Sequence, residues 1–298
     1  MHPSFQKLFV APGKHIPLRY VGTMIEGRWL NGQLEDESGF PFARVQNGIP
    51  FFVRREDDGW GTDEQVEALL TEHGVKRETL IPQNWQARLR NWDPSNKQYE
   101  WVQRIVEHGG LILEIACGPG GGFMPLILDL DPKAKLLAND IGGWILVEWK
   151  NFNDKNGLWT NASFAQFDVT KCPLRSECLD CVDSAGGLSN IEKSHLALAE
   201  IYRLLKPGGR LFMVDADADP SSFERLPSAE QDAWLERFPQ HGKGYEEELL
   251  KTGFEILEMK QTGKKPLKPH ESILAEIATK HGITMYLREY RIEARKPA

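Results

Sequence analysis

The sequence predicts an α/β protein whose core is a mostly parallel sheet. From about residue 95 onwards, short apolar segments alternate with segments whose apolar residues recur at helical spacing. The stretch ILEIACGPGGG, residues 112–122, places glycines directly after the first of these apolar segments. Repeated strand–helix–strand crossovers produce a parallel sheet that is covered by helices on both faces. A small β unit is expected to precede this region.

Five strands and four helices are expected in the first part of the α/β region. The first helix should end at Gly109 and Gly110, because glycine is a common helix terminator. The strands are expected at residues 111–116, 134–140, 162–168, 179–186 and 210–217, and the helices at residues 96–110, 123–131, 144–157 and 193–209.

An insertion and two further strands are expected after residue 216. Residues 217–243 are rich in proline, tryptophan and phenylalanine, and a short helix at residues 244–254 follows them. We expect residues 255–261, EILEMKQ, to run parallel to their neighbours. Residues 283–296 alternate apolar and polar side chains, which is typical of a half-exposed strand, here expected to be antiparallel.

The chain divides into three predicted parts. Residues 1–60 contain short alternating apolar stretches with turn residues and should form the small β-rich segment. Residues 61–94 are expected to be a helical connector. Residues 95–298 should form the main domain, with the insertion at residues 217–243.

Composition indicates an ordinary globular protein without a membrane span. The 298 residues are 41% hydrophobic and 27% charged, and no apolar run approaches the roughly 18 residues that cross a bilayer. No secretion signal is evident, so a cytoplasmic location is expected. The net charge of -7 disfavours a large nucleic-acid footprint without excluding one.

The four cysteines indicate buried thiols in a reducing compartment. They are Cys117, Cys172, Cys178 and Cys181, and the last two form a C-x-x-C pair. This pair lies at an apparently buried strand and has no second pair or nearby histidines, so no metal site is expected. An isolated buried cysteine usually packs as a small hydrophobic residue.

Acidic residues follow the glycine-rich loop at the ends of the next strands. Glu114 lies on the first strand, Asp140 ends the second, and Asp168 ends the third. In an open α/β sheet these ends meet at one edge, where ligands bind, and a carboxylate at the second strand end can accept the hydroxyls of a ribose. An ordinary turn with solvated carboxylates remains the alternative. The loop lacks the G-x-G-x-x-G spacing, which disfavours a dinucleotide-dependent oxidoreductase.

Residues 95–217 resemble the class I S-adenosylmethionine-dependent methyltransferases, of the type 11-like group. LEIACGPG, NDIGGWIL, QFDVTKCPL, LDCVDSAGGLSNI and EIYRLLKPGGRLFMVD follow the motifs of that family in order and spacing. The resemblance implies a Rossmann-like sheet of seven strands in the order 3-2-1-4-5-7-6, with strand 7 antiparallel. It also implies S-adenosylmethionine as cofactor and S-adenosylhomocysteine as product.

The resemblance assigns cofactor contacts to the glycine-rich loop. Gly118 and Gly120 should lie against the methionine and ribose parts, and Glu114 should orient the loop and the amino group. Ala116 and Cys117 complete these loop contacts. The family often has glycine where this chain has Ala116, and cofactor binding should tolerate the extra methyl group.

The resemblance also assigns contacts at the ends of the next three strands. Asp140 should hold the ribose, and Ile141 should pack on the adenine. Asp168 and Val169 should bind the edge of the adenine ring. The methionine part should be contacted by Ser184 and Ala185.

No catalytic residue is predicted for the methyl transfer. The chain has no N-P-P-[YF] motif after the fourth strand, and alignment of the reactants can suffice for in-line displacement. Asn190 and His195 are nearby in the sequence, but His195 is better explained by a place on a helix surface. The oligomeric state is likewise not predicted.

Two groups of residues are candidates for contact with a small-molecule acceptor. Trp234 and Phe238 of the insertion, and Trp85 and Trp92 before the main domain, could line a pocket or simply pack these segments. The second group would attract an anionic substrate, or else form a solvated loop, and consists of Lys264, Lys265 and Lys268.

Residues 25–53 resemble a small zinc-ribbon-like domain found as an activator of some methyltransferases. The segment contains no cysteine, so we expect it to be metal-free and structural. The leading hypothesis is a small-molecule methyltransferase. The alternatives are an RNA or protein methyltransferase that docks through this segment, and a non-catalytic protein that binds the cofactor.

Overall fold

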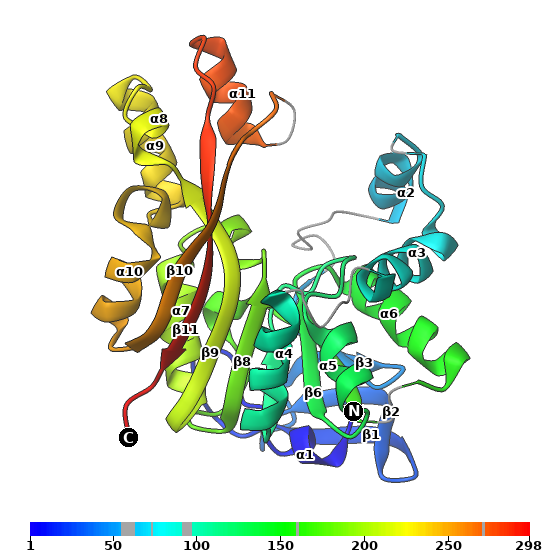
Figure 1. Cartoon of the computed structure of the whole chain (residues 1–298). Helices are drawn as coiled ribbons and strands as arrows, with labels where there is room; N and C mark the ends of the chain where they lie inside the picture. Colours follow the sequence, from blue (N-terminus) through cyan, green and yellow to red (C-terminus); the bar gives the residue numbers. More distant parts are fainter. Residues whose placement is uncertain (55–62, 73, 91–96, 159–160, 270–271) are drawn as a thin grey trace.

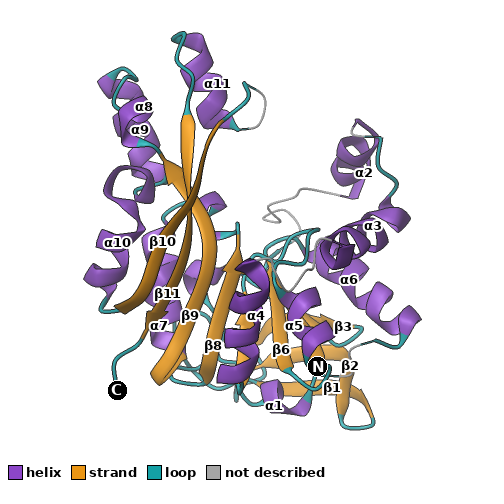
Figure 2. Ribbon diagram, viewed as in Figure 1, coloured by secondary structure: helices purple, strands orange, loops and turns teal. Residues whose placement is uncertain are grey.

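The computed structural model contains one mixed sheet of eleven strands (Figures 1 and 2). It describes all residues except 55–62, 73, 91–96, 159–160 and 270–271. The strands are β1 (Arg19–Ile25), β2 (Arg28–Glu35), β3 (Pro41–Gln46), β4 (Ile49–Phe51), β5 (Leu111–Glu114), β6 (Lys135–Asp140), β7 (Ala162–Gln166), β8 (Leu179–Ala185), β9 (Leu205–Ala218), β10 (Glu255–Pro266) and β11 (Tyr286–Arg295).

The sheet is larger than the seven strands expected from the sequence. Its order is β1-β2-β3-β4-β7-β6-β5-β8-β9-β11-β10. Strands β5 to β9 are mutually parallel, and β11 is antiparallel to both of its neighbours. The four amino-terminal strands join this sheet because Phe51 of β4 pairs in parallel with Gln166 of β7. An edge strand offers unpaired backbone groups, and β4 uses those of β7.

Helices cover both faces of the parallel strands (Figure 1). One core contains apolar side chains of α4 (Lys97–His108), α5 (Met124–Leu130) and α6 (Gly143–Asn156), together with those of α2 (Asp63–Glu72) and α3 (Arg77–Arg90). The other core contains side chains of α7 (Ser194–Leu204) and α10 (Gln240–Thr252), and it continues into the amino-terminal strands and α1 (Pro3–Gln6).

Glycine ends two of these helices where the sequence led us to expect an end. Gly109 and Gly110 follow α4 with φ of 66° and 83°, and Gly157 follows α6 with φ of 60°. These left-handed angles cost little in glycine, which has no side chain to clash with the preceding carbonyl. The helix over residues 193–209 is shorter than expected, because α7 ends at Leu204 and residues 205–209 already belong to β9.

The carboxyl-terminal strands correct two expectations. Residues 262–266, read as a loop, are the end of β10, and the neighbour of β10 is the antiparallel β11. Half of the residues of β11 are buried and the others are partly buried, so the strand is less exposed than expected. Its polar side chains Arg291 and Glu293 are covered by Arg104 and Glu258, which form ion pairs with them. The period of two therefore reflects a buried ionic face instead of a solvated one.

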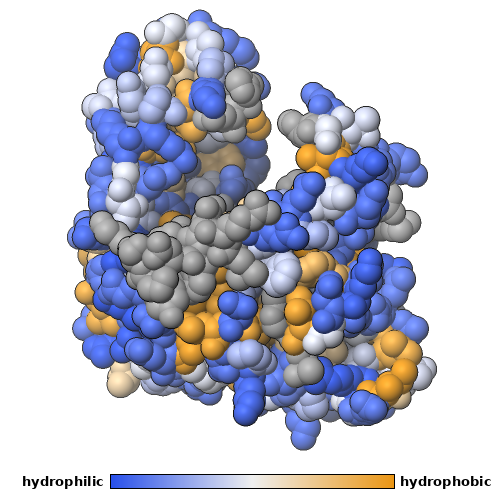
Figure 3. Space-filling model, turned by 45° about the vertical axis from the view of Figure 1, so that its right-hand side comes forward, coloured by the Kyte–Doolittle hydropathy of each residue, from blue (hydrophilic) through white to orange (hydrophobic). Residues whose placement is uncertain are grey.

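The insertion forms a small separate core beyond the end of β9. It contains α8 (Pro220–Phe223) and α9 (Ser228–Arg237), which pack with α11 (Ile273–Lys280). Figure 1 shows these helices on one side of the carboxyl edge of the parallel strands and α2 and α3 on the other. Figure 3 shows that the surface is hollowed between two raised parts of the molecule. No helix among the described residues has the length and apolar character needed to span a bilayer.

Candidate functional site

Asp140 fixes the glycine-rich loop against the end of β6. Its Oδ2 accepts a hydrogen bond from the Gly118 N–H at 2.8 Å, and its Oδ1 accepts one from the Gly142 N–H at 2.8 Å. The carboxylate is 4% exposed. Backbone donors aimed at both oxygens stabilise the charged form and hold two loops in a fixed relation. Asp140 therefore shapes the site as well as facing it.

Glu114 holds the other end of the same loop. Its Oε2 accepts hydrogen bonds from the N–H groups of Phe123 and Met124, at 2.7 and 3.1 Å. Burial and the neighbouring Glu114 carboxylate raise the pKa of Asp183 well above its usual value. A side chain at Gly122 would collide with the Glu114 carboxylate, so this glycine is required by contact as well as by its φ of 56°.

Ala116 occupies a backbone conformation that favours glycine. Its φ is 50°, in the left-handed region, where a Cβ atom is crowded by the carbonyl oxygen. The Ala116 methyl also lies where a side chain at Gly187 would meet it, at 2.6 Å from the ideal Cβ position. The left-handed φ explains why glycine would fit more easily at position 116. The contact with the Ala116 methyl explains why position 187 needs glycine.

The end of β7 presents a carboxylate, and the end of β6 presents an exposed apolar side chain. Asp168 Oδ1 accepts hydrogen bonds from the N–H and the hydroxyl of Thr170, at 2.8 and 2.7 Å, while Oδ2 has no such bond among the described residues. Ile141 is 39% exposed, which is unusual for a large aliphatic residue beside a buried strand. The Gln166 Nε2–H donates to the Ile141 carbonyl at 2.8 Å and fixes this residue in place.

These strand ends surround a cavity of about 730 Å³. Five of the predicted cofactor contacts line it: Ala116, Asp140, Ile141, Asp168 and Val169. Its other lining residues were not predicted as contacts, and they are Asn139, Phe167, Thr170, Asn190, Ile191 and Glu192. The sequence signal near Asn190, Ile191 and Glu192 was the run of small residues DSAGGLSN. It indicated free space above the sheet but not which side chains would fill that space.

The electrostatic character of the cavity is acidic. Asp140, Asp168 and Glu192 all line it, and none of its described lining residues is a lysine, arginine or histidine. Such a wall favours a cationic ligand and disfavours one that carries phosphate groups.

Six predicted cofactor contacts, Glu114 among them, are not part of the described lining of the cavity. Gly118 donates its N–H to Asp140, and Gly120 is in the same loop. Cys117 is 4% exposed, and burial, followed by the charges of Asp140 and Glu114, raises the pKa of its thiol well above the usual value. Ser184 is fully buried, and Ala185 is half-buried at the end of β8. Cys117 is therefore a packed thiol.

The aromatic residues proposed for the acceptor are packing residues in this structure. Trp234 and Phe238 are each 8% exposed and stack on each other, with ring centroids 4.6 Å apart, inside the insertion core. Trp85 packs α3 against Phe152 of α6 at a centroid distance of 5.3 Å. Trp92 lies outside the described residues.

Two of the three predicted lysines are engaged in ion pairs. Lys264 Nζ lies 2.9 Å from Asp219, and Lys265 Nζ lies 2.7 Å from Glu289. Because Lys264 and Lys265 are neighbours on β10, their side chains point to opposite faces of the sheet. The three lysines, Lys268 included, thus do not act as one cluster of free cations.

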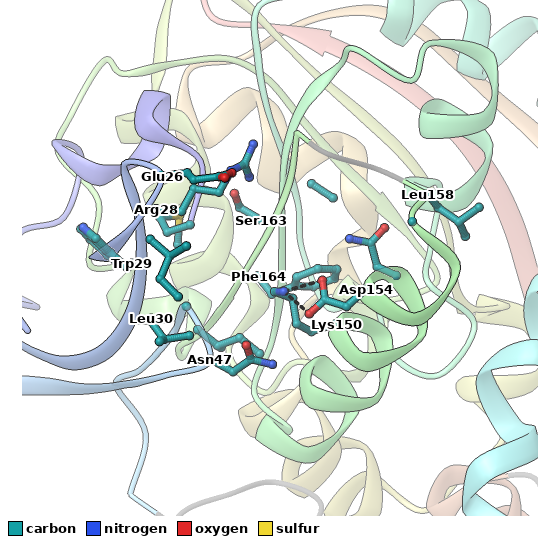
Figure 4. Close-up of a pocket in the computed structure, with 17 residues that line it drawn as sticks. Glu26, Arg28, Trp29, Leu30, Asn47, Lys150, Asp154, Leu158, Ser163 and Phe164 are labelled. Carbon is teal, nitrogen blue, oxygen red and sulfur yellow. Dashed lines mark hydrogen bonds and ion pairs between the residues drawn. The ribbon is translucent and has the colours of Figure 1, made fainter. Parts of the chain in front are cut away.

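A second cavity of about 530 Å³ lies against the amino-terminal strands (Figure 4). Trp29, Leu30 and Phe164 contribute apolar walls, and Lys150 forms an ion pair with Asp154 at 2.5 Å. This cavity is bordered by the beginning of β7 and the end of α6, whereas the acidic cavity is bordered by the ends of β6 and β7. In open α/β sheets the ligand site is at the carboxyl ends of the strands, which selects the acidic cavity.

Comparison with known proteins shows what this domain is similar to. Residues 113–213 match a family model described as a methyltransferase domain. The crystal structure of a candidate methyltransferase from Bacillus halodurans C-125 covers 68% of this chain and 100% of its own, with a TM-score of 0.50 and 19% identity. That likeness shows the fold. Residues 113–213 are therefore similar to a methyltransferase domain.

The curated relatives share this domain over about half of their length. The ubiquinone/menaquinone biosynthesis C-methyltransferase UbiE of Pseudomonas aeruginosa strain LESB58 is 33% identical over 117 residues, which are 39% of this chain and 45% of the relative. UbiE of Rhizobium etli strain CIAT 652 is 29% identical over 139 residues, or 46% of this chain and 52% of the relative. The chain spans about half the length of the curated relatives it matches.

Proposed function

We propose that this protein is an S-adenosylmethionine-dependent methyltransferase that acts on a small molecule. The observation that carries the proposal is the acidic cavity at the carboxyl edge of the parallel strands, within the matched domain. S-Adenosylmethionine carries a sulfonium and an ammonium group, so carboxylates around its site stabilise it electrostatically. Nicotinamide dinucleotides carry phosphates, which the same carboxylates repel.

The residues present fit this cofactor. Asp140 would accept the ribose hydroxyls, and Ile141 would pack against the adenine ring. Asp168 would accept a hydrogen bond from the adenine amino group through Oδ2. Gly118, with φ of 53° and open space at its ideal Cβ position, allows a ligand to approach the backbone closely.

The protein's contribution to the reaction is to position the reactants and exclude water. The cofactor supplies an activated methyl group, and the acceptor displaces it in line. The loop fixed by Glu114 and Asp140 would hold the donor, while the acceptor would enter through the hollow beyond the sheet edge (Figure 3). No general base is assigned. The names of the curated relatives make carbon the first acceptor atom to test.

Calorimetry with S-adenosylhomocysteine tests the cofactor site. Asp140→Asn should weaken binding by about tenfold or more, because a charged hydrogen bond is worth roughly 1.5–3 kcal/mol. Asp131→Asn is the matched control, since Asp131 also accepts a hydrogen bond from the N–H two residues on, at 2.9 Å, but lies before β6. Equal affinity in Asp140→Asn and the parent, or tighter binding of NAD⁺ than of S-adenosylhomocysteine, would overturn the assignment.

Transfer of a labelled methyl group from S-adenosylmethionine to metabolite extracts tests catalysis. A labelled small molecule supports the proposal. Label confined to RNA or protein would favour the macromolecular alternative, and binding without any transfer would favour the non-catalytic one.

We further propose that residues 1–60 are a structural, metal-free unit and that residues 95–298 form the catalytic domain, with 61–94 as connector. Supporting this, Phe9 and Trp29 of the first part pack in the same core as Leu113 and Val182 of the main sheet. Among the described residues there is no group of three or more histidines, cysteines or acids that could hold a metal. Elemental analysis that finds one zinc per chain would contradict the proposal.

A further inference from the structure

One wall of the acidic cavity is a short irregular segment between β8 and α7. We call residues 188–194 the pocket-wall segment. Its members Asn190, Ile191 and Glu192 line the cavity. Only one turn of 3₁₀ helix, Leu188–Asn190, stabilises it from within. Such a segment depends on contacts from outside to keep one shape, because it has few backbone hydrogen bonds of its own.

The insertion supplies these contacts through a fully buried glutamine. Gln240, the first residue of α10, is 0% exposed. Its Oε1 accepts a hydrogen bond from the Ser194 hydroxyl at 2.8 Å, and its Nε2–H donates to the Ser189 carbonyl at 3.4 Å. One planar amide therefore ties both ends of the pocket-wall segment, with the three cavity-lining residues between the two ties.

Arg237 makes a second connection from the insertion to the same segment. Its carbonyl accepts a hydrogen bond from the Lys193 N–H at 2.6 Å, and its guanidinium pairs with Glu192 at 2.6 Å. Lys193 has a φ of 55°, a left-handed conformation that costs free energy in a residue other than glycine. Strain of this kind persists only where surrounding contacts hold it, and at Lys193 the insertion supplies such contacts.

We propose that Gln240 is a positioning residue for the cofactor pocket: it acts through Ser189 and Ser194 to fix Asn190, Ile191 and Glu192. This inference rests on the proposed function, since it assigns a role in binding S-adenosylmethionine. Gln240 outweighs Arg237 in this role, because exposed ion pairs are screened by solvent whereas a buried amide loses its partners outright. The Arg237–Glu192 pair is about half exposed on each side.

The insertion, in this proposal, supports the wall of the cofactor pocket. Trp234 and Phe238 build the insertion core, and the core in turn places α10 and Gln240 beside the pocket wall. Any molecule that shifts the insertion would change the pocket wall and hence the affinity for the cofactor. Binding of the two reactants would then be coupled through this contact.

The test replaces Gln240 by methionine, which keeps the length of the side chain and removes both hydrogen bonds. The dissociation constant of S-adenosylhomocysteine, measured by calorimetry, should rise about tenfold in Gln240→Met. Gln231→Met is the matched control. Gln231 also donates to backbone carbonyls, those of Glu224 and Leu226 at 3.2 and 2.8 Å, but both of these acceptors lie within the insertion.

A double-mutant cycle separates positioning from general destabilisation. Ser194→Ala should weaken binding, and adding Gln240→Met should then cost less than it does alone, because both remove the same contact. Hydrogen exchange of the 190–193 amides, measured without ligand, should be faster in Gln240→Met and unchanged in Gln231→Met.

The outcomes distinguish a failure of the role of Gln240 from a failure of the proposed function. Equal affinities in Gln240→Met and Gln231→Met, or equal exchange at residues 190–193, would overturn the role of Gln240 while leaving the proposed function intact. If the parent protein does not bind S-adenosylhomocysteine, the proposed function fails and the inference with it. A tenfold loss confined to Gln240→Met, with faster exchange in the wall, supports it.

Discussion

Ala116 stores backbone strain at the site itself, since it is left-handed and is not glycine. Ala116→Gly should relieve this strain and raise the free energy of unfolding by up to about 1 kcal/mol, net of the greater freedom of glycine in the unfolded chain. Chemical denaturation measures the change. Ala134→Gly is the control, because Ala134 also lies in a loop but has no positive φ, and it should lose about 0.5–1 kcal/mol. A less stable Ala116→Gly variant would contradict the reading.

Asp215 and His241 make opposing contributions to stability over the same range of pH. Burial raises the pKa of Asp215 from 3.8 to about 6, although the N–H groups of Ser189 and Ala216 donate to it. Burial lowers the pKa of His241 from 6.5 to about 4. Between pH 4 and 6 the folded state holds the Asp215 proton more tightly than the unfolded state, so stability falls as pH rises. The unfolded state takes up the proton at His241, so stability from this group rises with pH.

The pH-dependent contributions of Asp215 and His241 to stability should largely cancel in the parent protein. Each should become measurable when the other residue is replaced. Asp215→Asn should become more stable as pH rises from about 4 to 6.5, and His241→Asn less stable, each by up to about 3 kcal/mol. Denaturant titrations at several pH values measure this. Parallel pH profiles for the parent and both variants would show that neither group is perturbed as described.

At the scale of elements, β4 supports the adenine end of the site. Phe52 N–H donates to the Gln166 carbonyl at 3.0 Å, and the Gln166 side chain holds the Ile141 carbonyl. Gln166→Ala should therefore weaken S-adenosylhomocysteine about three- to tenfold. Asn161→Ala is the control, because Asn161 also donates to a backbone carbonyl, that of Lys133 at 2.8 Å, but before the same strand begins. Equal losses in both variants would indicate a general effect on stability.

The order of strands and helices from residue 97 to 218 was predictable because it depends on local patterns. Apolar runs, glycines at helix ends and acids after strands are visible in adjacent residues, and they placed Asp140 and Asp168 at the cavity. The pairing of Phe51 with Gln166 joins residues far apart in the chain, and no local periodicity encodes it. The pocket wall was missed for the same reason, since its shape depends on Gln240 and Arg237 of the insertion.

The insertion aromatics show a second limit of local pattern. Trp234 and Phe238 have the same spacing whether they face a ligand or a small core. They are packed because α11 lies against them, and its residues Leu274 and Ala278 belong to the same cluster. The ion pairs of Lys264 and Lys265 were not visible in the sequence, because the acids that form them, Asp219 and Glu289, come from a turn and from another strand.

At the scale of the whole molecule, the amino-terminal strands and the main sheet share one core. Phe9 is 1% exposed, contacts Trp29 and Phe52, and forms a backbone bridge with Leu174. Phe9→Ala should cost about 3–5 kcal/mol and lower a single unfolding transition for the whole protein. Phe40→Ala should change little, because Phe40 is 60% exposed. Two separate transitions in the calorimetric trace would show that the amino-terminal unit folds independently.

All four cysteines are buried and unbonded, and burial raises the pKa of every thiol, that of Cys178 to about 11. Each can react with a disulfide reagent only when its surroundings open, because both access and the thiolate are needed. The reaction rates of the four cysteines therefore report how often their surroundings open, and no added label is needed. Cys117 reports the loop beneath Asp140, so S-adenosylhomocysteine should slow its reaction more than that of the other three, and mass spectrometry of timed samples would show it. Rapid labelling of Cys117 in the saturated protein would mean that the loop opens with the cofactor in place.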